Sequence, residues 1–289
     1  MVYRPPWWLP EGHSQTIMAA RWANKPSVQY HRVRWNTPDG DFIDLDFTEP
    51  PEHAAKHHTL WVLFHGLEGC SRSHYSLAVM NQARLSGALG VVVHFRGCSG
   101  ENNWMPRAYH SGDSPEMDWI LRRLRKQLPA VEHMHVTGVS LGGNVLLKWL
   151  GEQEKHAHEV VSSAVSVSAP VDLLAGAVSL AKGFNLVYTR MFLSTLVPKS
   201  IDKVKRFPEL GKAQDIANCK DFFDFDNRVT APWHGFRDAE HYYAVSSAKP
   251  LLKHIAVPTL MIHAKNDPFM SGQHLPAHHE VSSQVKCLF

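Results

Sequence analysis

The first patterned stretches of the chain alternate polar and apolar residues, and the stretches that follow are almost wholly apolar. The alternating stretches, 28–35 and 42–48, flank the turn sequence Pro38-Asp39-Gly40. Alternation with a period of two places one face of a strand against a core, so this pattern predicts an antiparallel β-hairpin at the edge of a sheet. The apolar runs 60–64 and 89–95 predict central, parallel strands that are buried on both faces.

Segments with helical periodicity separate the predicted strands. They span 75–85 and 115–128, and Ser114 is the candidate N-cap of the second, with proline in its first helical position. A further strand and helix follow, and then a strand over 160–168. Strands and helices therefore alternate from residue 60 onward. With right-handed crossovers this order predicts an α/β fold, a mostly parallel sheet covered by helices on both faces.

The strand rhythm stops between residues 170 and 253, where helical, aromatic-rich sequence intervenes. The sheet is expected to resume at 258–264. Because α/β folds of this length commonly form one domain, we expect a single domain over 1–289, with 170–253 as an inserted helical cap. The helices expected within the cap lie at 173–180, 184–196 and 239–251.

The segment Gly138-Val139-Ser140-Leu141-Gly142 joins an apolar strand to a predicted helix that includes 145–150. Gly-x-Ser-x-Gly between a strand and a helix is the nucleophile elbow of the α/β-hydrolase fold. Gly138 and Gly142 flank the serine because the two backbones approach so closely that a Cβ atom would clash. The pattern predicts that Ser140 is an exposed nucleophile. The alternative is an ordinary glycine-rich turn.

An acidic residue is expected later in the chain. Serine becomes a nucleophile at neutral pH when a base takes its proton and an acid orients that base. In this fold the chain order is serine, acid, histidine. Asp267 is the expected acid because it directly follows the strand predicted at 258–264, at the strand end where such sheets place their sites. A turn aspartate before Pro268 is the alternative.

An oxyanion hole needs backbone N–H groups that face the developing negative charge. One is expected from Leu141, directly after the nucleophile. The second is expected from Leu67, in the loop His65-Gly66-Leu67-Glu68-Gly69 that follows the strand at 60–64. His65 follows that strand directly, and this position favours a role in shaping the loop over a role as the base.

Charge and composition narrow the range of partners. Thirty Lys and Arg against 27 Asp and Glu leave a net charge of +3, and the basic residues are dispersed, so nucleic acid is not expected. A small molecule is the expected partner. The 20 histidines show no metal-ligand spacing, so we expect no metal site, and serine-based ester hydrolysis requires no cofactor.

Cysteine usage and hydropathy bear on the cellular compartment in which the protein is expected. The four cysteines are widely separated and form no CxxC pair, which fits free thiols in a reducing, cytoplasmic environment. Residues 1–10 lack the apolar core of a signal peptide. No stretch approaches about 18 uninterrupted apolar residues, so no integral membrane segment is expected.

Motifs spread over most of the chain point to one family. Besides the elbow and the loop at 65–69 they are Pro5-Pro6-Trp7-Trp8-Leu9, Gly12-His13-x-Gln15-Thr16, Phe95-Arg96-Gly97-Cys98-Ser99-Gly100, Ala108-Tyr109-His110-Ser111-Gly112-Asp113 and His263-Ala264-Lys265-Asn266-Asp267-Pro268-Phe269. Together they resemble the YheT-type esterases, the AB hydrolase 4 family, from about Arg4 to Met270. The resemblance implies a carboxylic ester hydrolase with a Ser-Asp-His charge relay, and eukaryotic relatives that act on lipid esters. Unlike those relatives, this chain is expected to lack an N-terminal membrane helix.

The sequence departs from that family at the base. The family's histidine lies in a Gly-Gly-His segment beyond the final strand, but only 268–289 follow Asp267, and 285–289 resembles that strand itself. His274, His278 and His279 precede it and are weak candidates. We expect this chain to end before the histidine loop and the last helix, through truncation. Loss of the base would lower kcat by about 10⁶.

Several interpretations stay open. A serine esterase is the favoured function, and a catalytically silent hydrolase-fold protein that binds a lipid or small ester is the alternative. Five apolar residues of the cap either line an acyl site or pack the cap onto the domain: Phe184, Leu186, Tyr188, Phe192 and Leu193. A small basic cluster either meets a membrane surface or an acidic substrate, or is a solvated face: Lys199, Lys203, Lys205 and Arg206.

Overall fold

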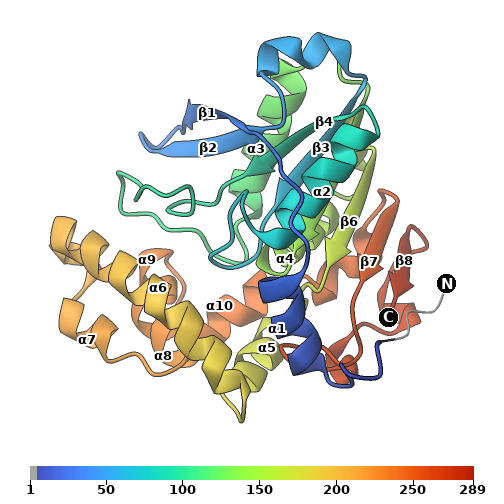
Figure 1. The fold of residues 1–289 in the computed structure, drawn as a ribbon. Coiled ribbons are helices and arrows are strands. Elements are labelled where there is room, and N and C mark those ends of the chain that lie inside the picture. Colours follow the sequence, from blue (N-terminus) through green and yellow to red (C-terminus); the bar gives the residue numbers. More distant parts are fainter. Residues whose placement is uncertain (1–4) are drawn as a thin grey trace.

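A computed structural model describes residues 5–289, in which one eight-stranded sheet runs through the molecule (Figure 1). The strand order is β1-β2-β4-β3-β5-β6-β7-β8. All neighbouring pairs are parallel except those that involve β2, which is antiparallel to both β1 and β4. The strand bounds are β1 (His31–Asn36), β2 (Phe42–Phe47), β3 (Thr59–Phe64), β4 (Leu89–Val93), β5 (His133–Val139), β6 (Ser163–Val167), β7 (Thr259–Ile262) and β8 (Val285–Leu288).

The N-terminal hairpin and the mostly parallel sheet are confirmed. The chain reverses through Gly40, whose φ of 81° is the left-handed conformation that glycine adopts without strain. The first strand begins at His31 and not at the predicted Val28. Val28 instead packs in a small buried cluster with Leu77 and Met80 of helix α2 (His74–Leu85), so tertiary packing shortens the alternating stretch.

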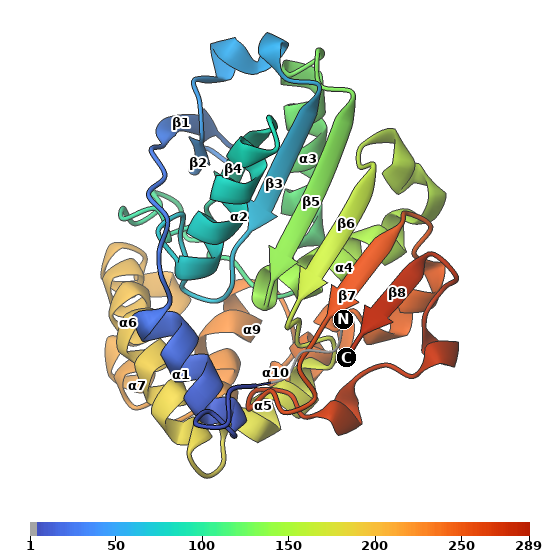
Figure 2. The same ribbon diagram turned by 45° about the vertical axis from the view of Figure 1, so that its right-hand side comes forward.

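Helices cover both faces of the sheet (Figure 2). Helix α2 lies on one face, and α3 (Ser114–Gln127) and α4 (Leu141–Gln153) lie on the other. The central strands are buried on both sides, as their apolar runs predict, and Trp149 of α4 is among the largest fully buried side chains. The N-terminal helix α1 (Gly12–Trp22) lies apart from these, against the C-terminal half of the fold.

Two predicted helix boundaries are wrong. Asp113, and not Ser114, is the N-cap of α3, because the Ser114 hydroxyl is drawn away to donate a hydrogen bond to the Glu152 carboxylate. The stretch expected as one helix over 239–251 divides into α10 (Ala239–Ser246) and a 3₁₀ turn. The division precedes Pro250, which has no N–H with which to continue a helix.

The segment between β6 and β7 contains only helices and turns among its described elements, and we call residues 168–258 the helical insertion. It lies beyond the carboxyl ends of the strands, where its long helix α6 crosses the end of the fold (Figure 1). The helix predicted at 184–196 extends to Arg206 and tolerates Pro198. The elements are α5 (Leu173–Leu180), α6 (Asn185–Arg206), η3 (Pro208–Leu210), α7 (Ala213–Ala217), α8 (Phe222–Phe225), η4 (Asp226–Thr230), α9 (Ala231–Trp233), α10 and η5 (Lys249–His254).

Two predictions about the chain as a whole concern membrane-spanning helices and cysteines. Over the described part of the chain, no helix is both long enough and apolar enough to cross a bilayer. All four cysteines are free thiols. Residues 1–4 lie outside the described residues. They include Arg4, where the family resemblance starts, and the first part of the segment predicted to lack a signal peptide.

Candidate active site

Ser140 sits at the turn between β5 and α4, in a strained backbone conformation. Its φ of 51° and ψ of −117° lie in a region that non-glycine residues rarely adopt. The turn is held because the Ser140 N–H donates to the Val167 carbonyl oxygen of β6 at 2.8 Å. A Cβ at Gly138 would overlap the Gly142 carbonyl, and one at Gly142 would lie 2.5 Å from the Phe64 carbonyl oxygen. The elbow predicted from the sequence is therefore present.

Two backbone N–H groups beside Ser140 lack hydrogen-bond partners within residues 5–289, those of Leu67 and Leu141. Their neighbours are all bonded. Gly66 N–H donates to the Tyr75 hydroxyl at 3.0 Å, and Gly142 N–H donates to the His65 carbonyl at 3.2 Å. Most N–H groups of a folded protein are paired, so two free donors from residues that line one cavity with Ser140 indicate a place for an anion or a polarised oxygen.

The loop that carries Leu67 is fixed through its own Glu68, which bonds to Tyr109 and Lys199 outside the loop. Glu68 has a φ of 55°, and its N–H donates to the Tyr109 hydroxyl at 3.0 Å. The same hydroxyl donates to the Glu68 carboxylate at 2.9 Å, and Lys199 of α6 pairs with the other carboxylate oxygen at 2.7 Å. The helical insertion is thereby tied to the loop. Sequence reasoning missed these contacts because they join residues up to 131 positions apart.

His65 lies beneath this loop and has both ring nitrogens occupied. Nδ1 lies 2.7 Å from the Gly66 carbonyl, and Nε2 accepts the Phe95 N–H at 3.1 Å. Burial lowers the pKa of His65 to about 3, so the ring stays neutral. These contacts are those of a residue that shapes the loop, as the sequence predicts, and they leave no ring nitrogen for Ser140.

Asp267 follows β7 and lines the same cavity as Ser140. Its Oδ1 accepts the Phe269 N–H at 2.8 Å, and its Oδ2 lies 3.5 Å from Nε2 of His263. Burial raises the pKa of Asp267, and these hydrogen bonds and the Ser168 hydroxyl oppose that rise. His263 is itself held neutral by burial, which lowers its pKa, and its Nε2 lies 3.2 Å from the Met270 carbonyl.

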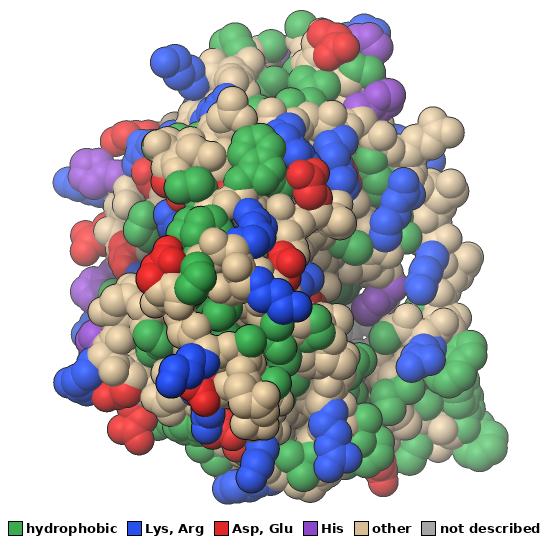
Figure 3. Space-filling model, turned by 90° about the vertical axis from the view of Figure 1, so that its left-hand side faces the viewer, with side chains coloured by type: hydrophobic (Ala, Val, Ile, Leu, Met, Phe, Trp, Pro, Cys, Tyr) green, Lys and Arg blue, Asp and Glu red, His purple; other side chains and the backbone are tan. Residues whose placement is uncertain are grey.

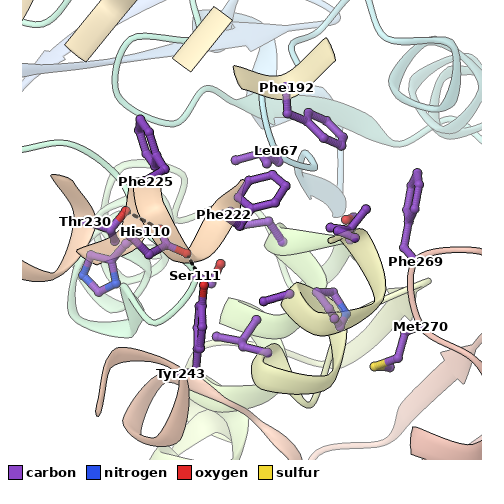
Figure 4. A pocket seen from close by; sticks show the side chains of 18 of the residues that line it. Leu67, His110, Ser111, Phe192, Phe222, Phe225, Thr230, Tyr243, Phe269 and Met270 are labelled. Atoms are coloured by element: carbon purple, nitrogen blue, oxygen red, sulfur yellow. Dashed lines mark hydrogen bonds between the residues drawn. The ribbon is translucent and has the colours of Figure 1, made fainter. Parts of the chain in front are cut away.

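One cavity of about 140 Å³ brings Ser140, Leu67, Leu141 and Asp267 together (Figure 4). Its wall is mainly apolar. In Figure 4 the polar side chains of His110, Ser111 and Thr230 lie on one side, and Phe269 and Met270 lie on the other. Helices α5 and α6 supply much of the wall, through Leu173, Ala177, Leu180, Phe192 and Leu196.

Of the five cap residues predicted to line or to pack, only Phe192 lines this cavity. Tyr188 packs against His13 of α1, with ring centroids 5.8 Å apart, and Leu193 belongs to a separate buried cluster inside the insertion. Phe184 is 52% exposed. Helical periodicity placed these residues on α6, but it could not indicate which side of α6 faces the cavity.

The basic cluster is not a uniform solvated face, although Lys205 and Arg206 are exposed. Lys203 is buried and donates to the carbonyls of Met105 and Arg107, and Arg206 donates to those of Asn103 and Trp104. Lys199 pairs with Glu68 as described above. Three of the four side chains thus bond α6 to neighbouring loops of the fold.

The histidines near the site differ from those considered in the sequence. His274 and His278 begin or end short 3₁₀ turns between β7 and β8, and neither they nor His279 line the cavity. The cavity histidines are His110 and His263, both in segments that the motif comparison singled out. Burial lowers the pKa of His110 to about 3. Over residues 5–289, no group of three or more His, Cys, Asp or Glu side chains is arranged to hold a metal ion.

Comparison with known proteins agrees with this fold. The family model described as alpha/beta hydrolase fold matches residues 61–288. "Putative esterase YheT" of Escherichia coli is 40% identical over 277 residues, which cover 95% of this chain and 80% of that protein. "Phospholipase ABHD3" of Homo sapiens is 27% identical over 280 residues, 95% of this chain and 68% of that protein.

A solved structure supports the fold independently. The Pyrococcus furiosus esterase Pf2001 superimposes with a TM-score of 0.58 at 16% identity, over 90% of this chain and 81% of that one. The likeness in fold thus extends through the helical insertion as well as the sheet. Together with the matched family model and the 40% identity to YheT, it leads to one conclusion. The chain belongs to the alpha/beta hydrolase fold family, within its YheT-type branch.

Proposed function

We propose that this hydrolase cleaves carboxylic esters through a covalent acyl-serine intermediate formed on Ser140. The observation that carries the proposal is the convergence of a strained serine, a buried carboxylate and two free backbone donors on one cavity. Esterases, a phospholipase and a monoacylglycerol lipase among the similar proteins support the same reaction class.

Each group has a defined task in the reaction. Ser140 Oγ attacks the ester carbonyl carbon while its proton passes to a base, and the amides of Leu67 and Leu141 stabilise the oxyanion. The base then protonates the departing alcohol, which leaves an acyl-serine that water hydrolyses. Asp267 orients the base and stabilises it when it is charged.

The base is the open position in this scheme. The order of the triad in this fold places it after the acid along the chain. His263 contacts Asp267, but its Nε2 lies 3.2 Å from the Met270 carbonyl, which is not the arrangement of a base that faces serine.

The contacts of His263 favour a second candidate, a protein that binds an ester in the cavity without turning it over, because the one described histidine that contacts Asp267 is held by the Met270 carbonyl. The cavity's apolar wall suits the acyl chain of a short ester or one end of a lipid ester in both cases. The two candidates differ in the nucleophilicity of Ser140, because a serine without a base reacts no faster than a free one.

The test is covalent labelling by a fluorophosphonate probe. We expect the full chain to be labelled at Ser140, as located by peptide mass spectrometry, and Ser140→Ala to abolish labelling. Ser194→Ala, at an exposed serine on α6, is the matched control and should label at the original rate. Labelling of the unmodified chain no faster than free serine would refute the hydrolase proposal for residues 1–289 and favour the binding candidate.

A further inference from the structure

Large apolar side chains are exposed mainly around α5, α6 and the N-terminal segment. The helical hairpin α5–α6 carries an exposed stripe, which we define as Leu174, Val178, Phe184, Val187 and Met191. The spacing of four on α5, and of three and four on α6, aligns these residues on one face of each helix. Phe184, Val187 and Met191 are all more than 50% exposed, and several large apolar side chains exposed on one helix are unusual for a protein without a partner at that place.

The hairpin has two apolar faces with different surroundings. Leu173 and Ala177 of α5 and Phe192 of α6 line the cavity that contains Ser140. The exposed stripe lies on the outer side of the same two helices, where Met191 is 53% exposed. A surface that contacts the stripe would therefore be separated from the cavity only by this hairpin.

Tryptophans extend the apolar surface beside the hairpin. Helix α1 lies next to the start of α6 in both ribbon views, and His13 of α1 packs against Phe184 with ring centroids 4.8 Å apart (Figures 1 and 2). Trp7 and Trp8 precede α1 and are 91% and 52% exposed, and Trp22 at its end is 67% exposed. Tryptophan is the side chain that membrane–water interfaces favour.

Positive charge accompanies this surface. Arg190 borders the stripe on α6, Lys182 lies in the turn between α5 and α6, and Arg21 and Lys25 flank Trp22. All four are exposed, and none of them forms an ion pair with another described residue. The one exposed carboxylate on this segment of α1 and its flanks is Glu11. Figure 3 shows Lys and Arg, together with Asp and Glu, interspersed with hydrophobic side chains on the side that carries α6.

We propose that the exposed stripe and the adjacent tryptophans dock onto an anionic lipid surface. Apolar side chains flanked by cations fit a bilayer interface, where the apolar groups enter the boundary of the acyl chains and the cations approach acidic headgroups. Docking would place the outer face of the α5–α6 hairpin on the lipid, next to the cavity. Docking at this place would deliver a lipid ester to Ser140, and this role rests on the proposed function.

The test is co-sedimentation of the full chain with phosphatidylglycerol–phosphatidylcholine vesicles and with pure phosphatidylcholine vesicles. We expect binding to the anionic vesicles that weakens with salt. Val187→Ser/Met191→Ser should reduce the partition coefficient about tenfold or more. Lys182→Gln/Arg190→Gln should reduce it by roughly fivefold for each charge removed.

Matched controls keep the outcomes separate. Leu85→Ser/Val245→Ser removes two exposed apolar residues elsewhere, and Lys56→Gln/Lys126→Gln removes two exposed lysines elsewhere, and both should bind like the unmodified chain. Circular dichroism and urea unfolding verify that each variant folds. Ser140→Ala should bind vesicles fully, so a failure of the esterase proposal cannot mimic a failure of docking.

Two results would overturn the docking proposal. One is the absence of binding to anionic vesicles, or binding that Val187→Ser/Met191→Ser leaves unchanged. The other is a dimer in solution, measured by light scattering, that the same substitution dissociates, since a second copy of the chain would then be the partner of the stripe.

Discussion

Gly142→Ala tests whether the close approach between the elbow and the loop at 65–69 is as tight as the structure indicates. An added Cβ would lie 2.5 Å from the Phe64 carbonyl oxygen and 2.6 Å from the His65 carbonyl oxygen. Both contacts are with backbone, so no side chain can rotate away. The end of β3 and the start of α4 would have to separate by several tenths of an ångström.

Two opposing effects set the change in the free energy of unfolding that Gly142→Ala should cause. Overpacking of this kind costs about 1–3 kcal/mol, and two backbone contacts place it near the upper end of that range. Alanine in place of glycine inside a helix returns about 1 kcal/mol. We therefore expect the free energy of unfolding to fall by about 2 kcal/mol. For a chain of this size the midpoint of thermal unfolding would fall by roughly 3 °C.

Gly176→Ala is the matched control, because it makes the same substitution within helix α5. Its nearest neighbour would be the Pro170 Cβ at 3.6 Å, an ordinary contact, so only the helix gain of up to about 1 kcal/mol applies. Urea unfolding followed by tryptophan fluorescence measures both variants. If Gly142→Ala unfolded at the same urea concentration as the unmodified chain, or a higher one, the argument from the close approach would be refuted.

Three further predictions follow from buried contacts. Tyr109→Phe leaves the Glu68 N–H without its acceptor and should cost about 1–3 kcal/mol in urea unfolding while slowing fluorophosphonate labelling; unchanged values for both would contradict the role of Tyr109 in fixing the loop. Arg96→Met leaves its buried carboxylate partners unpaired and should cost about 3–5 kcal/mol by the same measurement, and a cost below about 1 kcal/mol would show that solvent screens this network. Burial raises the pKa of Asp226 to about 6, whereas its pKa in the unfolded chain is about 4. Between about pH 4 and about pH 6 the folded state therefore binds more protons than the unfolded state. The free energy of unfolding should fall as the pH rises from about 4 to about 6. Asp226→Asn should remove that part of the pH dependence, and parallel profiles for the two proteins would count against it.

The sequence alone determined the features that depend on short-range pattern. Alternation around Gly40 and the apolar runs of β3 and β4 specify the hairpin and the central strands, because each is a local response to burial of one or both faces. The elbow at Ser140 is recognised from a segment only five residues long, although Gly142 is required there by the distant backbone of Phe64 and His65. The same locality explains why α5 was predicted with its observed bounds, Leu173–Leu180.

Tertiary structure alone decided which side chains meet. Lys199 lies in a basic cluster by sequence, yet it pairs with Glu68, and Phe192 alone among the predicted cap residues faces the cavity. His263 contacts Asp267 although no base was expected before the acid. These outcomes depend on how α6 is rotated and where the helical insertion packs across the strand ends. Periodicity identifies the apolar face of a helix, but only long-range packing selects what that face contacts.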